Sequence, residues 1–462
     1  MPKYRNEVDS LGTVRVPNKA YYGAQTKRAI DNFPVSGEPM PLRFIHALAL
    51  VKKAACHANE DLGLIDTEMA EWIQQAAQEV IDGDWDEQFP IDVFQTGSGT
   101  STNMNANEVI GNRASELMGG ELGARHPVHP NDHVNMSQSS NDVIPSALHL
   151  AGAMALHQDL IPALKCLHKE LVAKSVEWDR VVLSGRTHLM DATPIRLGQV
   201  FSGYAAQIEK GVQRAEGAML PLLELALGGT AVGTGLNCPE GFAELAIRRI
   251  VEETDLDFHR ADNPFEAQSA RDAVVEVSGQ LKVIAVSLSK IAGDVRLMAS
   301  GPRAGLGELI LPAVQPGSSI MPGKVNPVHC EMVVMVAAQV MGNDVAITHG
   351  GAGGQLQLNA MLPLLAKNLL SSVELLSGAA RTFGMRCVRA LEANEAQCQA
   401  TLERNLSMGT ALAPALGYDR AAELAKQAHA QGASIREVAL AEAVLSEDEL
   451  KRLLDPISLT GA

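Results

Sequence analysis

The chain has 462 residues, of which 46% are hydrophobic and only 4% aromatic, so it can build a large core from aliphatic side chains, as packed helices do. Its formal net charge of −16 argues against nucleic acid as a partner, because nucleic-acid binding needs a basic surface. The six cysteines contain no CxxC pair, which argues against a disulfide framework or a zinc ribbon and fits the reducing cytoplasm.

The first part of the chain is predicted to be mixed in structure. Residues 1–45 are rich in Pro, Gly, Asn and Tyr, so we expect irregular or extended backbone there. Apolar spacing predicts helices over 43–62 and 67–81, followed by a loop-like stretch over 83–100. A further helical stretch should contain Glu108.

Long helical patterns begin near residue 138. Apolar residues recur at helical spacing, with few breakers, over five segments: 141–178, 194–227, 267–300, 327–349 and 356–384. Residues 268–300 contain no proline and predict one helix of about 45–50 Å. Because this helix is apolar over much of its surface, we expect it inside a bundle or at a subunit interface. No segment has eighteen consecutive apolar residues, so we predict no membrane span.

Shorter helices are expected from residue 394 onward. Two stretches, Ser434–Glu437 and Ser446–Glu449, fit the capping-box pattern that marks a helix start. We therefore predict a mainly α-helical protein of three domains. These are a mixed, mostly helical N-terminal domain (1–137), a central long-helix bundle (138–393) and a small C-terminal helical domain (394–462).

The strongest functional signal lies in residues 317–327, which read Gly-Ser-Ser-Ile-Met-Pro-Gly-Lys-Val-Asn-Pro. Glycine lets backbone N–H groups approach a ligand, and the run adds two hydroxyls, a lysine and an amide. Such a loop can wrap a small anion. It is not a nucleotide-binding P-loop, because five residues separate its glycines and Val325 follows the lysine. An acidic substrate would be repelled by the net charge, so its site needs local positive charge, for which Lys324 is a candidate.

Two segments in the first third of the chain offer further groups for binding carboxylates. Residues 96–105 combine hydroxyls with mobile glycines before a helix, although a turn that caps this helix explains them equally well. Residues 137–142 start a long helix, whose N–H groups and dipole favour an anion. Plain N-capping by Ser140, Asn141 or Asp142 is the alternative there, and both roles are compatible.

Three other features allow both a structural and a catalytic interpretation. His188 lies in residues 184–191, and a lone histidine is more often structural than catalytic. Glu331 falls in the first turn of a predicted helix, where the dipole alone favours an acid. The histidines of residues 125–133 resemble a metal site, but ligands four residues apart need a helix, and the prolines there favour extended backbone. We therefore predict no metal.

Residues 317–327 resemble the signature of the fumarase/aspartase superfamily, Gly-Ser-Ser-x-Met-Pro-x-Lys-x-Asn-Pro, at every fixed position. The Gly-Arg-Thr-His string that ends at His188 is similar to the fumarase form of a second family motif. Aspartases usually carry Gln at this position and Ala at the position of Gly323, and other lyases of the superfamily differ more around Lys324. The chain thus resembles the class II, metal-free fumarases.

This resemblance implies reversible hydration of fumarate to L-malate by C3 proton abstraction, as in the citric acid cycle, through an aci-carboxylate intermediate. It implies the superfamily lyase fold, with central helices that assemble into a homotetrameric core and active sites shared between subunits. A small dicarboxylate is the expected partner, without nucleic acid, membrane, metal or cofactor, in the cytoplasm. Aspartate ammonia-lyase activity, or another fumarate-producing lyase reaction, is the alternative. A catalytically silent homologue should have lost Ser318, Lys324 or His188, and all three are present.

The resemblance also assigns roles to individual residues. Ser318 would abstract the C3 proton, His188 oriented by Glu331 would handle the water, and Lys324 would stabilise the developing charge; the division between Ser318 and His188 stays open. The implied substrate-binding residues are Ser98, Gly99, Thr100, Ser139, Ser140, Asn141, Thr187, Ser319, Lys324, Val325 and Asn326. A second anion site would comprise His126, His129, Pro130, Asn131 and Asp132, although the family commonly has Arg in place of His126.

Overall fold

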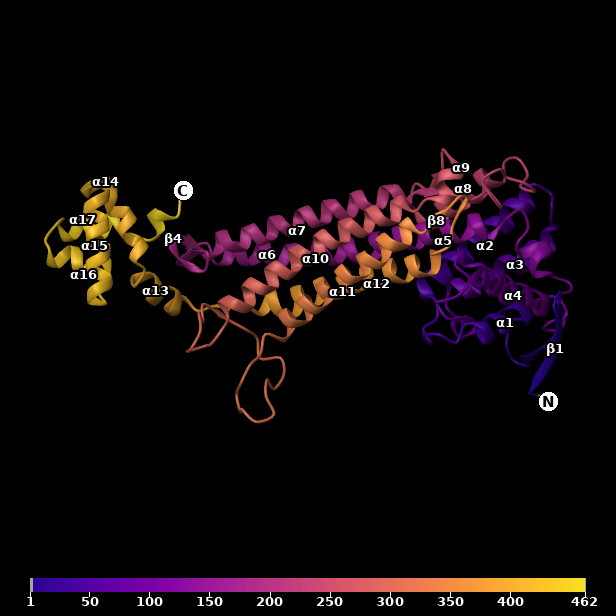
Figure 1. The fold of residues 1–462 in the computed structure, drawn as a ribbon, viewed down its shortest axis with the longest axis horizontal. Coiled ribbons are helices and arrows are strands. Elements are labelled where there is room, and N and C mark those ends of the chain that lie inside the picture. Colours follow the sequence, from indigo (N-terminus) through magenta and orange to yellow (C-terminus); the bar gives the residue numbers. More distant parts are fainter. Residues whose placement is uncertain (1–2, 462) are drawn as a thin grey trace. The chain divides into compact units, whose positions relative to one another are not determined.

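The structure, a computed structural model, describes residues 3–461, and the chain divides into two compact units. Unit 1 contains residues up to 162, 213–283 and 338–377, and unit 2 contains 163–212, 284–337 and 378 onward. The division falls within five helices: α6 (Ile161–Glu177), α7 (Leu197–Met219), α10 (Asp272–Met298), α11 (Val328–Ala352) and α12 (Leu362–Thr382). The structure is mainly helical, as predicted (Figure 1). The three domains 1–137, 138–393 and 394–462 stay a prediction.

Unit 1 begins with an antiparallel hairpin of β1 (Tyr4–Asp9) and β2 (Gly12–Pro17). The helices that follow are α1 (Ala24–Asn32), α2 (Leu42–Asp61), α3 (Thr67–Ile81), α4 (Thr100–Leu117), α5 (Ser140–Ala155), α8 (Phe242–Thr254) and α9 (Pro264–Ser269). The predicted helices 43–62 and 67–81 are confirmed as α2 and α3. Residues 1–45 were expected to be irregular or extended, which is right for the hairpin but wrong for α1.

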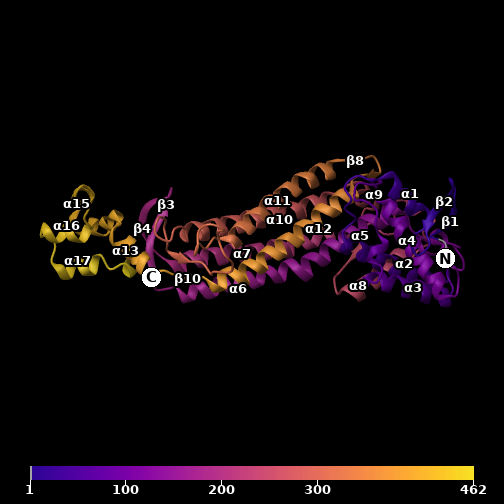
Figure 2. The ribbon, with the colours of Figure 1, turned by 90° about the horizontal axis from the view of Figure 1, so that it is seen from below.

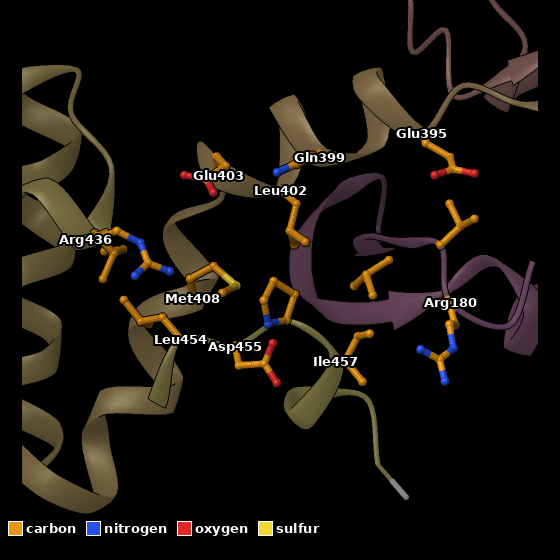
Figure 3. A pocket seen from close by; sticks show the side chains of 14 residues that line it. Arg180, Glu395, Gln399, Leu402, Glu403, Met408, Arg436, Leu454, Asp455 and Ile457 are labelled. Carbon is orange, nitrogen blue, oxygen red and sulfur yellow. The ribbon is translucent and has the colours of Figure 1, made fainter. Parts of the chain in front are cut away.

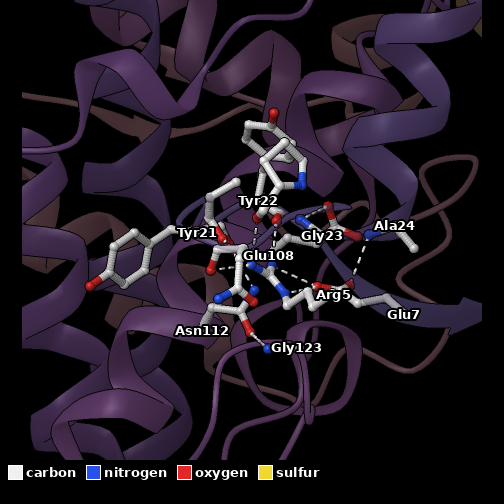
Figure 4. Close-up of polar contacts among 12 residues, drawn as sticks. Arg5, Glu7, Tyr21, Tyr22, Gly23, Ala24, Glu108, Asn112 and Gly123 are labelled. Atoms are coloured by element: carbon white, nitrogen blue, oxygen red, sulfur yellow. Dashed lines mark hydrogen bonds and ion pairs between the residues drawn. The ribbon is translucent and has the colours of Figure 1, made fainter. Parts of the chain in front are cut away.

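Helix α1 was missed because its N-terminus is capped by a residue distant in sequence (Figure 4). The Glu108 carboxylate accepts hydrogen bonds from the backbone N–H groups of Gly23, Gln25 and Thr26, at 2.8, 2.9 and 3.1 Å. Glu7 accepts a further one from Ala24 N at 3.0 Å. These carboxylates supply the partners that the first turn of any helix lacks. No local pattern in residues 24–32 predicts these capping carboxylates.

Two of the predicted long segments contain a local irregularity. Helix α5 continues through a π-helical turn (Leu156–Leu160) into α6 (Ile161–Glu177), as expected. The single helix predicted over 268–300 is confirmed as α10, which begins four residues later than expected because extended backbone at Ala270 separates it from α9. Helix α10 therefore has 27 residues and spans about 40 Å. Within each unit, parts of the long helices lie side by side (Figures 1 and 2).

The long helices bury an apolar stripe and leave other apolar side chains in solvent. The predicted stripe of α10, from Val274 to Val295, is buried. On the same helix Val286 is 51% exposed, and on α11 Met335 is 66% and Val345 58% exposed. Among residues 3–461, α11 alone is long and apolar enough to cross a membrane. The core helix of a soluble protein has the same length and composition, and 39% of the most apolar part of α11 is buried inside the structure. The single chain thus leaves apolar helix surface uncovered.

Unit 2 also contains a hairpin that the sequence patterns did not predict, formed by β3 (Val182–Thr187) and β4 (Met190–Arg196). The short strands β7 (Leu309–Ile310) and β10 (Glu392–Ala393) form an antiparallel pair. In the sequence, β7 precedes α11 and β10 follows it. The chain ends with α13 (Glu395–Glu403), α14 (Ala413–Leu416), α15 (Tyr418–Gln431), α16 (Ile435–Ala441) and α17 (Glu447–Leu453). Both predicted capping boxes, at Ser434 and Ser446, are confirmed.

The remaining strands are two residues long. In unit 1, β5 (Glu224–Leu225) pairs in parallel with β6 (His259–Arg260), and β8 (Gly354–Gln355) pairs with β9 (Leu358–Asn359). Strand β9 occupies the start of the helix predicted over 356–384, so α12 begins later than expected. Likewise β4 and β5 occupy the two ends of the segment 194–227, and α7 fills only its middle.

Candidate active site

The predicted carboxylate-binding segment 137–142 forms the N-terminus of α5. Ser139 is the N-cap, its Oγ accepts from Asn141 N at 3.2 Å, and its own N–H donates to Asp142 Oδ1 at 2.9 Å. The expectation that Ser140, Asn141 or Asp142 is the N-cap is therefore wrong. Asp142 is instead the third helical residue, from which a carboxylate reaches back to close a capping box.

Asp142 also ties this helix start to the 228–231 loop. Its Oδ2 accepts from Gly228 N at 3.1 Å and Thr230 N at 2.9 Å, while the Asn141 side chain donates to Ala231 O at 2.8 Å. Burial raises the pKa of the Asp142 carboxyl to about 6, although these N–H donors and the charge of Lys52 oppose the shift. The helix start is thus held rigidly from both sides.

Lys52 is a buried cation beside this helix start that the sequence patterns did not single out. Its Nζ donates to Asn135 Oδ1 at 2.9 Å and Gln138 Oε1 at 3.0 Å, in the turn that precedes Ser139. Lys52 is fully buried, and this burial lowers its pKa to about 7 against the opposing charge of Asp142. Adjacent lysines in a helix usually indicate a solvated face, so the sequence carries no signal for its burial.

The residues Ser98, Gly99 and Thr100 lie next to α5. The Ser98 and Thr100 hydroxyl oxygens are 2.8 Å apart, and Gly99, with a φ of 73°, is the N-cap of α4. A Cβ at Gly99 would lie 2.8 Å from the Ile144 side chain of α5, so only glycine allows this approach. Unit 1 therefore brings two of the predicted substrate-binding segments together.

The segment of the predicted second anion site forms a capped turn. His129 Nδ1 accepts from Asn131 N at 3.3 Å and Asp132 N at 3.1 Å, at the start of a π-helical turn (Pro130–Val134). His133 Nδ1 accepts from His129 N at 2.9 Å. The described residues contain no group of three metal-binding side chains here or elsewhere. The role of His126 and residues 129–132 as an anion site stays a prediction.

In unit 2, Thr187 and His188 lie at the tip of the β3–β4 hairpin. His188 and Leu189 form its two-residue turn, and both have positive φ, 56° and 61°. Turns of this shape normally use Asn and Gly, and a non-glycine residue with positive φ costs roughly 1–3 kcal/mol. This is why the sequence did not predict the hairpin. Strain of this kind is typical of functional sites.

The hairpin is fixed along its strands by buried polar groups. The Arg186 guanidinium donates to both Glu308 oxygens, at 3.0 and 2.8 Å, and Glu308 is fully buried. The buried Asn405 side chain donates to Ser184 Oγ at 3.0 Å and Ala192 O at 2.7 Å. Glu308 directly precedes β7, which leads into the 317–327 loop. The hairpin and the signature loop therefore share one anchor.

The signature loop 317–327 is closed on itself. Gly317 N donates to Lys324 O at 2.9 Å, and the Asn326 side chain donates to Gly317 O at 2.6 Å. A Cβ at Gly317 would lie 2.1 Å from Lys324 O, so this closure requires glycine. The Ser318 Oγ accepts from Ile320 N at 3.3 Å and Met321 N at 3.1 Å. This hydroxyl oxygen therefore faces two N–H donors, which would stabilise negative charge on it.

Several predicted residues of this loop are open to solvent in the single chain. Ser319, Lys324 and Val325 are exposed. Glu331 lies in the first turn of α11, as predicted, and is exposed as well. Within residues 3–461 no hydrogen bond or ion pair joins Glu331 to His188. The predicted orientation of the histidine by this acid stays a prediction.

A cavity of about 330 Å³ in unit 2 contains none of the predicted site residues (Figure 3). Arg180, Arg436 and Asp455 lie around it, and Leu402 and Met408 give it an apolar wall. It lies among the C-terminal helices and the start of β3. The candidate active site is therefore not this cavity.

Known proteins are similar to this chain over almost their full length. A family model described as lyase matches residues 12–342, and one described as fumarase C C-terminus matches 409–461. A class II fumarate hydratase of Halobacterium salinarum is 57% identical over 457 residues, which cover 99% of this chain and 97% of that protein. A class II fumarate hydratase of Bradyrhizobium diazoefficiens is 52% identical over 459 residues, with 99% and 97% covered.

Solved structures agree with the sequence relatives. The crystal structure of a class II fumarase from Schistosoma mansoni matches with a TM-score of 0.95 and 41% identity, and 99% of each chain is covered. A fumarate lyase from Brucella melitensis in native form matches with a TM-score of 0.92 and 46% identity, covering 98% of this chain and 99% of that one. With its signature loop, its Gly-Arg-Thr-His hairpin and these matches along the whole sequence, the chain belongs to the class II fumarase family.

Proposed function

We infer that this chain catalyses the reversible hydration of fumarate to L-malate, as a hydro-lyase of the citric acid cycle. The relatives that match its whole length are named fumarate hydratases. The observation that carries the chemistry is the Ser318 hydroxyl with its two backbone N–H donors. The reaction must remove a weakly acidic proton next to a carboxylate, so it needs a base and a preorganised environment for negative charge.

In the proposed mechanism Ser318 abstracts the C3 proton of malate. A serine is a poor base unless its alkoxide is stabilised, and the N–H groups of Ile320 and Met321 point at its oxygen. Lys324 and Asn326 then hold the carboxylate that becomes the doubly charged aci-carboxylate. His188, oriented by Glu331, protonates the leaving hydroxyl or activates the water in the reverse direction.

In the proposed assembly, hydroxyl and amide groups of different subunits would bind the substrate carboxylates. Thr100, Ser139, Ser140 and Asn141 would contribute from unit 1, with Ser98 and Gly99 shaping the α4 start. Thr187, Ser319 and Val325 would contribute from unit 2. Local positive charge comes from Lys324 and the helix dipole of α5, which opposes the net charge of −16. The turn with His126 and residues 129–132 would bind a second anion near this site.

We propose that the enzyme is a homotetramer whose active sites combine residues of different subunits. The signature loop exposes Ile320 to 84%, Met321 to 48% and Val325 to 42%, an unusual density of apolar side chains for a solvated loop. The uncovered apolar residues of α10 and α11 offer helix surface for association. Six thiols without a disulfide fit a cytoplasmic enzyme.

The competing function is that of aspartate ammonia-lyase, which uses the same loop and differs in the leaving group. The purified enzyme should produce fumarate from L-malate and none from L-aspartate, measured by the ultraviolet absorbance of fumarate. Fumarate from aspartate at a comparable rate would overturn the assignment. Loss of malate dehydration in the Ser318→Ala variant would separate the enzyme's own activity from a contaminant.

A further inference from the structure

A second candidate ligand site lies in unit 1, away from the signature motifs. A cavity of about 200 Å³ lies between α5, the β5 region and the α9–α10 junction. Two of its lining residues, Arg271 and His149, are only 2% and 8% exposed. Both carry polar atoms without a partner: Nε and Nη1 of Arg271 and Nε2 of His149. Buried polar atoms of this kind are rare because each costs roughly 1–3 kcal/mol when left unsatisfied.

The arginine is a buried cation without a carboxylate in contact. Its Nη2 donates to Ala267 O, and no ion pair joins Arg271 to another of residues 3–461. Burial lowers its pKa to about 10, so it stays charged at neutral pH. A buried guanidinium normally needs hydrogen-bonded anionic partners. The cavity therefore presents two donor nitrogens without a partner and one positive charge.

The histidine presents the opposite kind of group. Its Nδ1 lies 2.7 Å from Glu224 O, and since a carbonyl only accepts, Nδ1 carries the proton. Burial lowers the pKa of His149 to about 3, so the ring is neutral and its Nε2 is a bare acceptor. A ligand in this cavity has to offer a donor to Nε2 as well as acceptors to the guanidinium.

Carboxylates line the solvent-facing side of the same cavity. Glu266, Asp272 and Glu276 are exposed, and within the described chain none of their carboxylates has a hydrogen-bond or ion-pair partner. A simple anion, including a dicarboxylate, would be repelled by these negative charges on its way to the buried Arg271. A simple cation would meet the guanidinium. A molecule with a carboxylate and an ammonium group satisfies both sides.

We propose that this cavity binds a small zwitterionic α-amino acid. Its carboxylate accepts from Arg271, and its ammonium donates to His149 Nε2 and to Glu266 or Glu276. The rest of the lining consists of Glu224, Pro221 and three alanines, and the proline and alanines suit a short aliphatic side chain. Waters alone could fill the space, but they would not neutralise the charge of the buried guanidinium or of the carboxylates around it.

The test measures binding of L-alanine to the full-length protein by calorimetric titration, with propionate and ethylamine as probes that carry only one of the two charges. L-Alanine should bind saturably with one site per chain. Propionate and ethylamine should each bind at least about tenfold more weakly, since each lacks one set of charge-assisted hydrogen bonds. Propionate binding as tightly as L-alanine, or no saturable binding of L-alanine at millimolar concentration, would overturn the proposal.

Variants locate the site. Arg271→Met should abolish L-alanine binding, whereas the matched control Arg260→Met removes an exposed arginine and should leave binding unchanged. Glu266→Gln with Glu276→Gln alters only exposed side chains, so it tests the ammonium end even where Arg271→Met fails to fold. This double variant should weaken L-alanine several-fold and leave propionate no weaker than before. Unchanged L-alanine binding in Arg271→Met, or in the folded double variant, would contradict the proposed site.

Discussion

The two polar segments best placed to bind substrate differ in how much of their environment the single chain supplies. The start of α5 is held by a capping box, by two backbone donors from the 228–231 loop and by the buried Lys52 behind it. The 317–327 loop is closed by two hydrogen bonds between its own ends, and most of its side chains are in solvent. The first segment is complete within its unit, whereas the second lacks neighbours.

This difference suggests a division of labour. A carboxylate-binding helix start gains from rigidity, because fixed N–H groups bind without losing further entropy. The reactive loop carries the proposed base and cation, and its exposed apolar residues require a cover before water can be excluded. In the proposed tetramer a neighbouring subunit supplies that cover. Substitutions in the loop should then affect chemistry, and those behind α5 should affect binding.

The largest effect is expected from Ser318→Ala. Loss of a general base should lower kcat by roughly 10²–10⁴ and stop exchange of the malate C3 proton with deuterated water, followed by NMR. Substrate should still protect the variant against heat, because the proposed carboxylate-binding segments are intact. The exposed Ser202→Ala on α7 is the control. Exchange that persists while dehydration stops would place Ser318 at the other proton-transfer step.

Lys324→Met should come next, with kcat lower by about 10²–10³ and an unchanged circular dichroism spectrum. The variant removes the positive charge that the loop supplies to the aci-carboxylate. Lys290→Met, which removes an exposed lysine on α10, serves as the control for net charge. More than roughly a tenth of the parental activity in Lys324→Met would exclude this role.

Mixed oligomers test whether the loop is completed by another subunit. His188→Asn and Lys324→Met should each be inactive alone but partly active after they are unfolded and refolded together. Some sites of a mixed tetramer would then draw both intact residues from different chains. Dehydration of malate by the mixture, measured against each variant refolded alone, checks this. Verified hetero-oligomers without activity would mean that both residues of a site come from one chain.

The smallest effect is expected behind the rigid segment, from Lys52→Met. Removing a buried charge near the α5 start should raise KM for fumarate roughly five- to tenfold with little change in kcat, an effect of about 1 kcal/mol. Lys52 is charged below its pKa of about 7 and neutral above it, so the KM difference should be largest below pH 7 and fade at higher pH. Lys53→Met, which removes the neighbouring lysine paired with Glu253, is the matched control. Equal KM values for both variants, or a change confined to kcat, would contradict the proposed electrostatic role.

Motifs and periodicity were enough to predict much of the helical content. Periodicity located α2, α3 and α11 within a few residues, since each buries an apolar face that its own sequence encodes. Two short capping boxes were equally local and were confirmed. The signature at 317–327 and the string ending at His188 led to the family without any structure, because a ligand-binding loop needs particular side chains in a fixed order.

Elements that depend on distant partners were missed. Helix α1 exists because Glu108, far away in sequence, caps it, and the His188–Leu189 turn exists because Arg186, Glu308 and Asn405 hold its strands. The later start of α10 was also not predicted, because extended backbone at Ala270 separates it from α9.

The sequence by itself determined the helical class, the family and the reactive side chains, because these depend on local spacing and chemical identity. Only the tertiary structure decided that Lys52, Asp142 and Arg271 are buried and how the Ser318 oxygen is hydrogen-bonded. Burial and hydrogen-bond partners are set by segments that meet in space, and through desolvation they fix the charge that each group carries.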